Sequence, residues 1–337
     1  MISPELSVVI PALNEESNVD ELYRELRVVL EGCVSSFEVI FVDDGSTDRT
    51  AQRVRLIHEV DSRVGLIKLS RNFGHQRALM CGFGAARGQA VVAMDADFQH
   101  PPEMIPRLVD RWREGAPVVQ TVRGDGEGTG LLKRWTSRVF YAVIRRLTGM
   151  DIKQAAADFF LADRSVVEVL KKCQERSRFT RGLIAWVGFK RDFVAYNCGN
   201  RRHGRSKYTF GRMINLALDA VFSFSVVPLR LTGLAGLVAT FLSTLYLAYV
   251  LAAKLLTKSA TPGWASTIGV VVFLGGVQLV ALWVMGEYLA RIAEESRQRP
   301  PYVVDWSSSV MPTNGGRFEE ARQVSAQERE SESEVHV

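Results

Sequence analysis

Short apolar runs alternate with amphipathic segments along the first 100 residues of this chain. Each apolar run has five or six residues and ends in polar side chains; the runs cover 6–11, 37–42, 64–69 and 90–94. Between them, residues 14–30 and 78–86 carry apolar side chains at the three- and four-residue spacing of a helix that covers a core. Strands that alternate with helices predict an α/β domain with a mostly parallel sheet.

A second pattern begins near residue 226. Residues 231–253 contain no charged side chain, and neither do residues 259–286. A helix needs about 20 apolar residues to cross the hydrocarbon core of a bilayer. The sequence therefore predicts two transmembrane helices, at about 228–253 and 266–288. Two buried core helices of a soluble protein are the alternative, which the length of both stretches disfavours.

Two further segments are predicted to be amphipathic helices at a membrane interface. Residues 131–149 carry apolar side chains at helical spacing, with lysine and arginine elsewhere around the helix. Residues 209–225 form a juxtamembrane helix with a similar apolar side. For residues 131–149 the alternative is an ordinary helix that packs on a core and exposes its charged face.

Charge and composition refine the domain organisation. The net charge is +5, with basic clusters within 123–147 and 201–212 and an acidic, serine-rich tail after Arg322. We expect a catalytic domain at 1–208, the membrane region at 226–292 and a tail at 293–337 that is disordered from about 314.

The basic clusters suit anionic lipid head groups or phosphates, and no nucleic-acid-binding motif is present, so we expect no nucleic acid partner. The apolar run at 6–10 is too short for a signal peptide. Arginines flanking the two predicted spans place the catalytic domain and both termini in the cytoplasm. The four cysteines show no C-x-x-C spacing, which favours free thiols.

Polar residues follow three of the predicted strands, where parallel sheets bind their ligands. The first cluster is residues 11–15, the second is residues 43–46, and the third is Asp95-Ala96-Asp97, shortly before a double proline. Because alternate residues of an extended chain share a face, Asp95 and Asp97 are expected to hold one hard cation together. The alternative is that both aspartates only form a turn and cap the helix that follows.

Several segments resemble the polyprenyl-phosphate glycosyltransferases of glycosyltransferase family 2, which have the GT-A fold. The resemblance covers about residues 6–304, and its order and spacing are more specific than any single motif. It rests on the three strand-end clusters together with residues 71–74, 95–103, 158–159, 175–179 and 204–208. It implies transfer of a hexosyl group, with inversion, from a nucleotide sugar to polyprenyl phosphate, by a multi-pass protein of the inner cell membrane that acts in the cell envelope.

The resemblance also implies a role for particular residues. Asp95, Asp97 and Gln99 would hold Mg²⁺ or Mn²⁺, the ions that prefer oxygen ligands. The nucleotide-binding set is Pro11, Asn14, Glu15, Asp43, Asp44 and Ala96; the alternative for one of the two adjacent aspartates is a helix cap alone. Arg71 would reach the donor phosphates or form a salt bridge within the fold.

The acceptor phosphate would be held by a basic set made up of Arg123, Arg201, Arg202, Ser206 and Lys207. Asp158 would orient sugar hydroxyls or the acceptor, or else form a turn. The residues expected to take part in catalysis are thus Asp97, Asp158 and Arg201. His100 is expected to be solvated, with a neutral hydrogen-bond donor near the metal as the other interpretation.

Two departures from the family pattern concern the acceptor side. Phe160 stands where many relatives carry arginine, and Gly124-Asp125-Gly126 replaces a second arginine after Arg123. UDP-glucose is the favoured donor, with GDP-mannose or a modified UDP-sugar open, and a homo-oligomer is expected. The alternatives are a processive polysaccharide synthase of the same fold, whose usual Gln-x-x-Arg-Trp motif is absent, and a membrane protein that binds nucleotide sugar or lipid without turnover.

Overall fold

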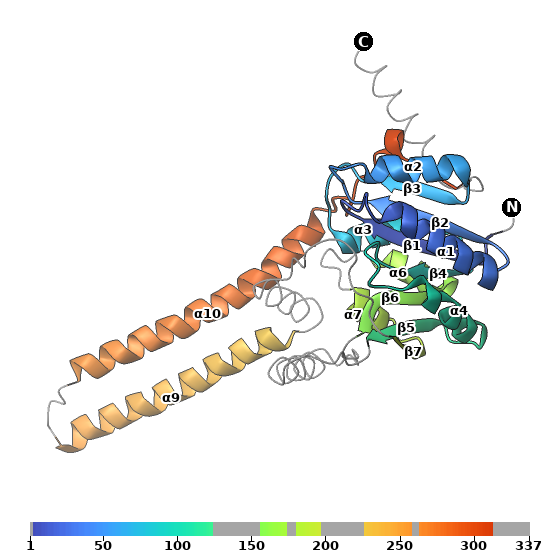
Figure 1. The fold of residues 1–337 in the computed structure, drawn as a ribbon. Coiled ribbons are helices and arrows are strands. Elements are labelled where there is room, and N and C mark those ends of the chain that lie inside the picture. The colour runs from blue at the N-terminus through green and yellow to red at the C-terminus, as the bar shows by residue number, and fades with distance from the viewer. Residues whose placement is uncertain (1–2, 124–155, 174–179, 197–225, 258–262, 313–337) are drawn as a thin grey trace, which may run out of the picture. The chain divides into compact units, whose positions relative to one another are not determined.

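The computed structural model describes residues 3–123, 156–173, 180–196, 226–257 and 263–312 (Figure 1). The chain divides into two compact units. The first contains residues 1–145, 150–208 and 300–337, and the second contains residues 146–149 and 209–299. The chain thus enters the second unit at residues 146–149 and again at residue 209, and it returns to the first unit at residue 300.

A seven-stranded mixed sheet forms the centre of the first unit, in the order β3-β2-β1-β4-β6-β5-β7 (Figure 1). The strands are β1 (Leu6–Ala12), β2 (Phe37–Asp43), β3 (Val64–Lys68), β4 (Ala90–Ala93), β5 (Val118–Arg123), β6 (Ala156–Asp163) and β7 (Arg191–Tyr196). The first four are parallel, as the sequence pattern predicts. β6 runs antiparallel to both β4 and β5, and β7 runs parallel to β5.

Helices cover both faces of this sheet because its strands are apolar on both sides. α1 (Val19–Cys33), α2 (Thr50–Val60) and α4 (Ile105–Arg113) contribute to the core on the face that includes Val8 and Ile10 of β1. α3 (His75–Ala85) packs on the opposite face, near α6 (Arg164–Lys172). A Cβ atom on Gly82 of α3 would lie 2.2 Å from a Val9 methyl group, so only glycine permits this close approach.

The strand directions bring several chain segments to one edge of the sheet. The carboxyl ends of β1, β2, β3 and β4 share this edge because the four strands are parallel. β6 runs the other way, so its amino end lies there, and the carboxyl ends of β5 and β7 follow. We call this the functional edge.

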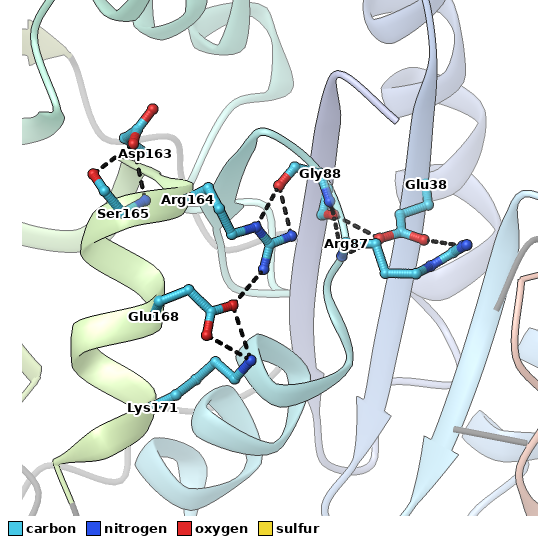
Figure 2. Close-up of polar contacts among 9 residues, drawn as sticks. Glu38, Arg87, Gly88, Asp163, Arg164, Ser165, Glu168 and Lys171 are labelled. Atoms are coloured by element: carbon cyan, nitrogen blue, oxygen red, sulfur yellow. Dashed lines mark hydrogen bonds and ion pairs between the residues drawn. The ribbon is translucent and has the colours of Figure 1, made fainter. Parts of the chain in front are cut away.

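The opposite edge holds a buried polar network (Figure 2). Glu38 of β2, with 2% of its side chain exposed, accepts hydrogen bonds from the Ser7 hydroxyl at 2.6 Å and from the Arg87 backbone N–H at 2.7 Å. The Arg87 guanidinium donates a third bond to Glu38 at 2.5 Å. Beside it, Arg164 donates to the Gly88 carbonyl and pairs with Glu168. The network joins β1, β2 and α6 to the turn before β4.

Residues 303–310, which we call the edge segment, lie along the outer side of β3. Leu66 and Val310 exchange two backbone hydrogen bonds, at 2.7 and 2.8 Å. The Ser70 N–H donates to the Val303 carbonyl at 2.9 Å, and the Asp305 N–H donates to the Lys68 carbonyl at 2.8 Å. A short helical turn, η2 (Trp306–Ser308), lies between these contacts. The segment therefore pairs backbone groups that an edge strand would otherwise leave open.

The second unit contains two long helices in contact with each other, α9 (Val227–Thr257) and α10 (Trp264–Ser296), of 31 and 33 residues (Figure 1). Both are long and apolar enough to cross a membrane, and they cover the two stretches that the sequence predicts as spans. Large apolar side chains lie on their surface, among them Leu237 and Phe273, which are 70% and 68% exposed. This exposure argues against buried core helices of a soluble protein. The predicted interface helices at 131–149 and 209–225 lie outside the described residues.

Candidate active site

Asp43 and Asp44 stand at the carboxyl end of β2 and are almost completely buried, at 1% and 3% exposure. Asp44 accepts the backbone N–H groups of Phe73 and Gly74, at 2.7 and 2.9 Å. Burial raises the pKa of Asp44, although these two bonds act to lower it. Both Asp44 oxygens therefore bind the loop before α3, and this aspartate stabilises that loop.

Asp43 is placed differently. Its Oδ1 accepts the Ser46 N–H at 3.0 Å, whereas its Oδ2 is buried and has no hydrogen-bond partner among the described residues. A buried polar atom without a partner is unfavourable unless a ligand or water completes it. Of the two adjacent carboxylates, Asp43 is the one with an oxygen available to a ligand.

The loops beside these aspartates hold one another in place. Asn14, in the left-handed region at φ 59°, accepts the Thr47 N–H at 2.9 Å, and the Asn14 N–H donates to the Ser46 hydroxyl. Glu15 donates its backbone N–H to the Thr50 hydroxyl. A Cβ atom on Gly45, at φ +74°, would lie 2.5 Å from the Arg71 carbonyl carbon, so this turn requires glycine.

Three residues of the expected nucleotide-binding set remain. Pro11 and Ala96 are buried beside the functional edge. Arg71 is exposed, and its guanidinium lies over the Phe73 ring at 4.3 Å from the centroid. No salt bridge of Arg71 is found within the described residues, so the expected alternative of a salt bridge within the fold finds no support there.

Asp95 follows β4 and is bound by a histidine that sequence reasoning missed. His75 is the first residue of α3, and its Nε2 lies 2.7 Å from Asp95 Oδ1. Burial acts to lower the pKa of His75, but the hydrogen bond to Asp95 and the charges of Asp95, Asp158 and Asp44 raise it to about 8. Burial acts to raise the pKa of Asp95, but His100, His75 and Arg181 outweigh it and hold that pKa well below its usual range. Asp95 is therefore ionised.

Asp97 is engaged separately. β4 ends at Ala93 and the chain bends over residues 96–100, so the rule that alternate residues share a face does not extend to Asp97. Asp97 Oδ1 accepts the Gln99 N–H at 3.1 Å, and Oδ2 accepts from the Gln99 side-chain amide at 3.0 Å. Within the described residues, no group of three His, Cys, Asp or Glu side chains is gathered for a metal.

The oxygen donors of this segment nevertheless fit Mg²⁺ or Mn²⁺. Asp95 and Asp97 each supply a carboxylate, and the Gln99 amide supplies an oxygen two residues further on. Hard divalent cations take carboxylate and amide oxygens, with water filling the remaining positions. Asp95, Asp97 and Gln99 are thus the residues that could hold such an ion.

His100 is buried, which contradicts the expectation of a solvated side chain. Its ring stacks on Phe159 at 5.1 Å between centroids and lies edge-on to Tyr196 at 6.4 Å. His100 Nδ1 accepts the Asp95 backbone N–H at 2.9 Å. The aromatic neighbours come from β6 and β7, distant in sequence, and for that reason the local sequence does not indicate the burial.

Asp158 lies at the amino end of β6, on the functional edge. Arg181 of α7 (Thr180–Trp186) binds it through two parallel bonds, Nε to Oδ1 and Nη2 to Oδ2, both at 2.8 Å. Phe160 of the same strand is buried, with its ring edge-on to Phe83 at 6.1 Å. Position 160 is therefore part of the core, and the cation beside Asp158 comes from Arg181.

The remaining expected residues lie at or beyond the limits of the described structure. Arg123 is the last residue of β5, opposite Tyr196 of β7, which places its backbone at the functional edge. Arg201, Arg202, Ser206 and Lys207 lie outside the described residues. His75 and Arg181 are the two residues near the carboxylates that sequence reasoning missed. His75 does follow the third strand within a polar cluster, which is a signal that could have found it.

Comparisons with known proteins identify the family of the chain. Residues 7–171 match the model of the family "Glycosyl transferase family 2". An uncharacterized glycosyltransferase of Synechocystis sp. is 40% identical over 91% of this chain and 98% of its own. A bactoprenol glucosyl transferase of Shigella phage SfV is 37% identical, over 89% and 97%. Among solved structures, glucosyl-3-phosphoglycerate synthase of Mycobacterium tuberculosis with Mn²⁺ and UDP-glucose is 22% identical over 65% of this chain and 78% of its own, with a TM-score of 0.45.

Proposed function

The chain belongs to glycosyltransferase family 2, and on that premise we propose that it transfers a hexosyl group from a nucleotide sugar to polyprenyl phosphate. UDP-glucose is the favoured donor, because several relatives of similar length are named bactoprenol glucosyl transferases. The main structural support for donor binding comes from Asp43, whose buried Oδ2 has no hydrogen-bond partner within the described residues.

Asp43 would receive the donor nucleotide. A ring N–H of the base or a ribose hydroxyl can donate to Oδ2, and the ligand would then complete a buried carboxylate. Asp44 would not touch the donor; it holds the loop at residues 73–74 that borders the site. The close approach of Gly45 to Arg71 keeps these two loops together.

Catalysis requires that the charge growing on the leaving diphosphate be neutralised. Asp95, Asp97 and Gln99 would hold a divalent cation, which supplies Lewis-acid stabilisation of that diphosphate. His75 binds Asp95 and orients this carboxylate. Asp158, at the same edge, would accept hydrogen bonds from hydroxyls of the transferred sugar. The acceptor phosphate is already largely dianionic at neutral pH, so a strong general base is not required.

The acceptor half would lie in a membrane. α9 and α10 are long and apolar enough to span it, and their exposed apolar side chains suit lipid. Arg123 and the basic residues Arg201, Arg202, Ser206 and Lys207 would bind the lipid phosphate. We infer a protein of the inner membrane with its catalytic unit in the cytoplasm, and a homo-oligomer as its assembly.

A transfer assay tests this function. Membranes that carry the full chain are incubated with labelled UDP-glucose, GDP-mannose or UDP-N-acetylglucosamine, and the label in a lipid extract is measured with Mg²⁺, Mn²⁺ or EDTA. We expect label in a lipid-linked monosaccharide only when a divalent cation is present. Asp97→Asn should reduce transfer at least about 100-fold, by analogy with loss of a stabilising group at a transition state.

Asp192→Asn is the matched control. Asp192 is a carboxylate of β7 near the strand end remote from the functional edge, so this change should leave transfer unaltered. Equal transfer by Asp97→Asn and the wild-type chain would refute the metal assignment. A polymeric product would instead favour a processive synthase, and absence of donor consumption across the panel would favour a protein that binds without turnover.

A further inference from the structure

Asp95 and Asp158 both lie at the functional edge, one just after β4 and the other near the start of the neighbouring strand β6. The antiparallel register of β4 and β6 pairs Ala90 with Asp163 and Ala93 with Phe160. Asp95 thus lies two residues after the last paired residue of β4, and Asp158 lies two residues before Phe160, the partner of that residue in β6. Carboxylates gathered at one edge of a sheet repel each other unless neighbouring groups offset the repulsion.

Two basic side chains bind these carboxylates. His75 binds Asp95, and Arg181 binds both oxygens of Asp158. The Arg181 guanidinium therefore lies against both oxygens of Asp158, while His75 holds one oxygen of Asp95.

The helix that carries Arg181 is anchored at the site. Thr180, the residue before Arg181 and fully buried, hydrogen-bonds through its hydroxyl to the side-chain carbonyl of Gln76. Gln76 directly follows His75 in α3. The first turn of α7 and the first turn of α3 are therefore joined, and both His75 and Arg181 are presented from connected helix ends.

We propose that Arg181 is a positioning residue, which fixes Asp158 as the acceptor of hydroxyl groups of the transferred hexose. An ionised carboxylate has about four acceptor sites, and the two bonds from Arg181 leave further sites for a ligand. The paired geometry fixes the carboxylate plane, which a lysine would not do. The arginine that many relatives carry at position 160 is replaced here by Phe160, which is buried in the core, so the positive charge beside Asp158 comes from Arg181. This assignment rests on the proposed function.

The test compares binding of UDP with binding of UDP-glucose, and measures kcat and KM for the transfer, on the full chain in lipid nanodiscs. Arg181→Ala should leave the affinity for UDP within about twofold of wild type, because Arg181 acts on the sugar side. The kcat should fall about 10- to 100-fold, the size expected for loss of a charged hydrogen bond. Arg181→Lys should recover only part of this loss.

Asp158→Asn supplies the second arm. It should reduce kcat by a similar factor, and the double change Arg181→Ala with Asp158→Asn should be no worse than Asp158→Asn alone, because both act through one carboxylate. Multiplying losses in the double variant would overturn the proposal. An equal loss of affinity for UDP in Arg181→Ala would also overturn it, since Arg181 would then bind the phosphates.

Arg164→Ala is the matched control for a purely structural arginine. Arg164 has the same 28% side-chain exposure as Arg181, but it binds Gly88 and Glu168 at the opposite end of the sheet (Figure 2). Its loss should lower the unfolding temperature and leave kcat unchanged. If Arg181→Ala behaves in the same way, the positioning role is refuted. The binding arm needs no lipid acceptor, so wild-type binding without lipid transfer would count against the proposed function alone.

Discussion

Replacement of each of the adjacent aspartates Asp43 and Asp44 by asparagine should give opposite results. Asp44 accepts two backbone N–H groups, one on each oxygen. Asparagine keeps one acceptor and turns an NH₂ group toward the other N–H. The variant therefore loses a bond to a charged acceptor and leaves a buried donor without a partner. The loss in unfolding free energy is about 3 kcal/mol.

For a domain of this size, 1 kcal/mol shifts the unfolding temperature by about 2–4 °C, so Asp44→Asn should lower it by about 6–12 °C. Asp43→Asn keeps the acceptor that binds the Ser46 N–H, and its amide group replaces only the oxygen without a partner in the described structure. Its unfolding temperature should change by less than about 4 °C, for a loss below about 1 kcal/mol.

The affinity for UDP should rank the two variants in the opposite order to their stability. Asp43→Asn removes the charged acceptor proposed for the nucleotide, so the affinity for UDP should fall about 10- to 100-fold. Asp44→Asn, measured well below its unfolding temperature, should have an affinity for UDP closer to that of the wild type than Asp43→Asn has. Thermal unfolding and titration calorimetry of the full chain give both quantities. Unchanged UDP affinity in Asp43→Asn, or unchanged stability in Asp44→Asn, would refute the division of roles.

Three further changes test the scaffold. The hydrogen bond from the Arg63 guanidinium is the main reason that the pKa of Asp61 lies well below its usual range. The ionised Asp61 therefore stabilises the fold above its unfolded-state pKa of about 3.9, and this stabilisation is lost as the pH falls. Asp61→Asn should flatten the decline in unfolding free energy below about pH 4. Val310→Pro removes the N–H that donates to Leu66, and should increase hydrogen exchange along β3. Arg87→Met leaves its buried carboxylate partner unpaired and should reduce the unfolding free energy by about 3 kcal/mol, as denaturant titration would measure.

The parallel half of the sheet follows from the sequence because its signals are local. Each of the first four strands is a short apolar run, and a polar cluster marks the functional end of each. The direction of β6 has no such local signal, because pairing with β4 depends on residues about 70 positions apart. The edge segment at 303–310 is hidden for the same reason, since nothing in its mixed apolar and polar sequence indicates that it pairs with β3.

Within the candidate site, the residue types were predictable and their partners were not. Asp43 and Asp44 look equivalent in sequence. Both oxygens of Asp44 accept backbone N–H groups, whereas Asp43 keeps one oxygen without a partner among the described residues. Asp95 and Asp97 look like one pair, but the strand ends at Ala93 and the two are bound by different side chains. These distinctions depend on where the chain bends, which periodicity does not reveal.

The reversal of strand direction at β6 explains why Asp158 belongs to the site at all. β6 has an aspartate near each end, Asp158 and Asp163. Because β6 is antiparallel to β4, Asp158 lies at the functional edge, while Asp163 lies at the other edge and caps α6 by accepting the Ser165 N–H at 2.9 Å. If β6 were parallel to β4, Asp158 would be displaced by about five residues, or about 17 Å. The two aspartates would then exchange edges, and Arg181 would have no carboxylate to position beside Asp95.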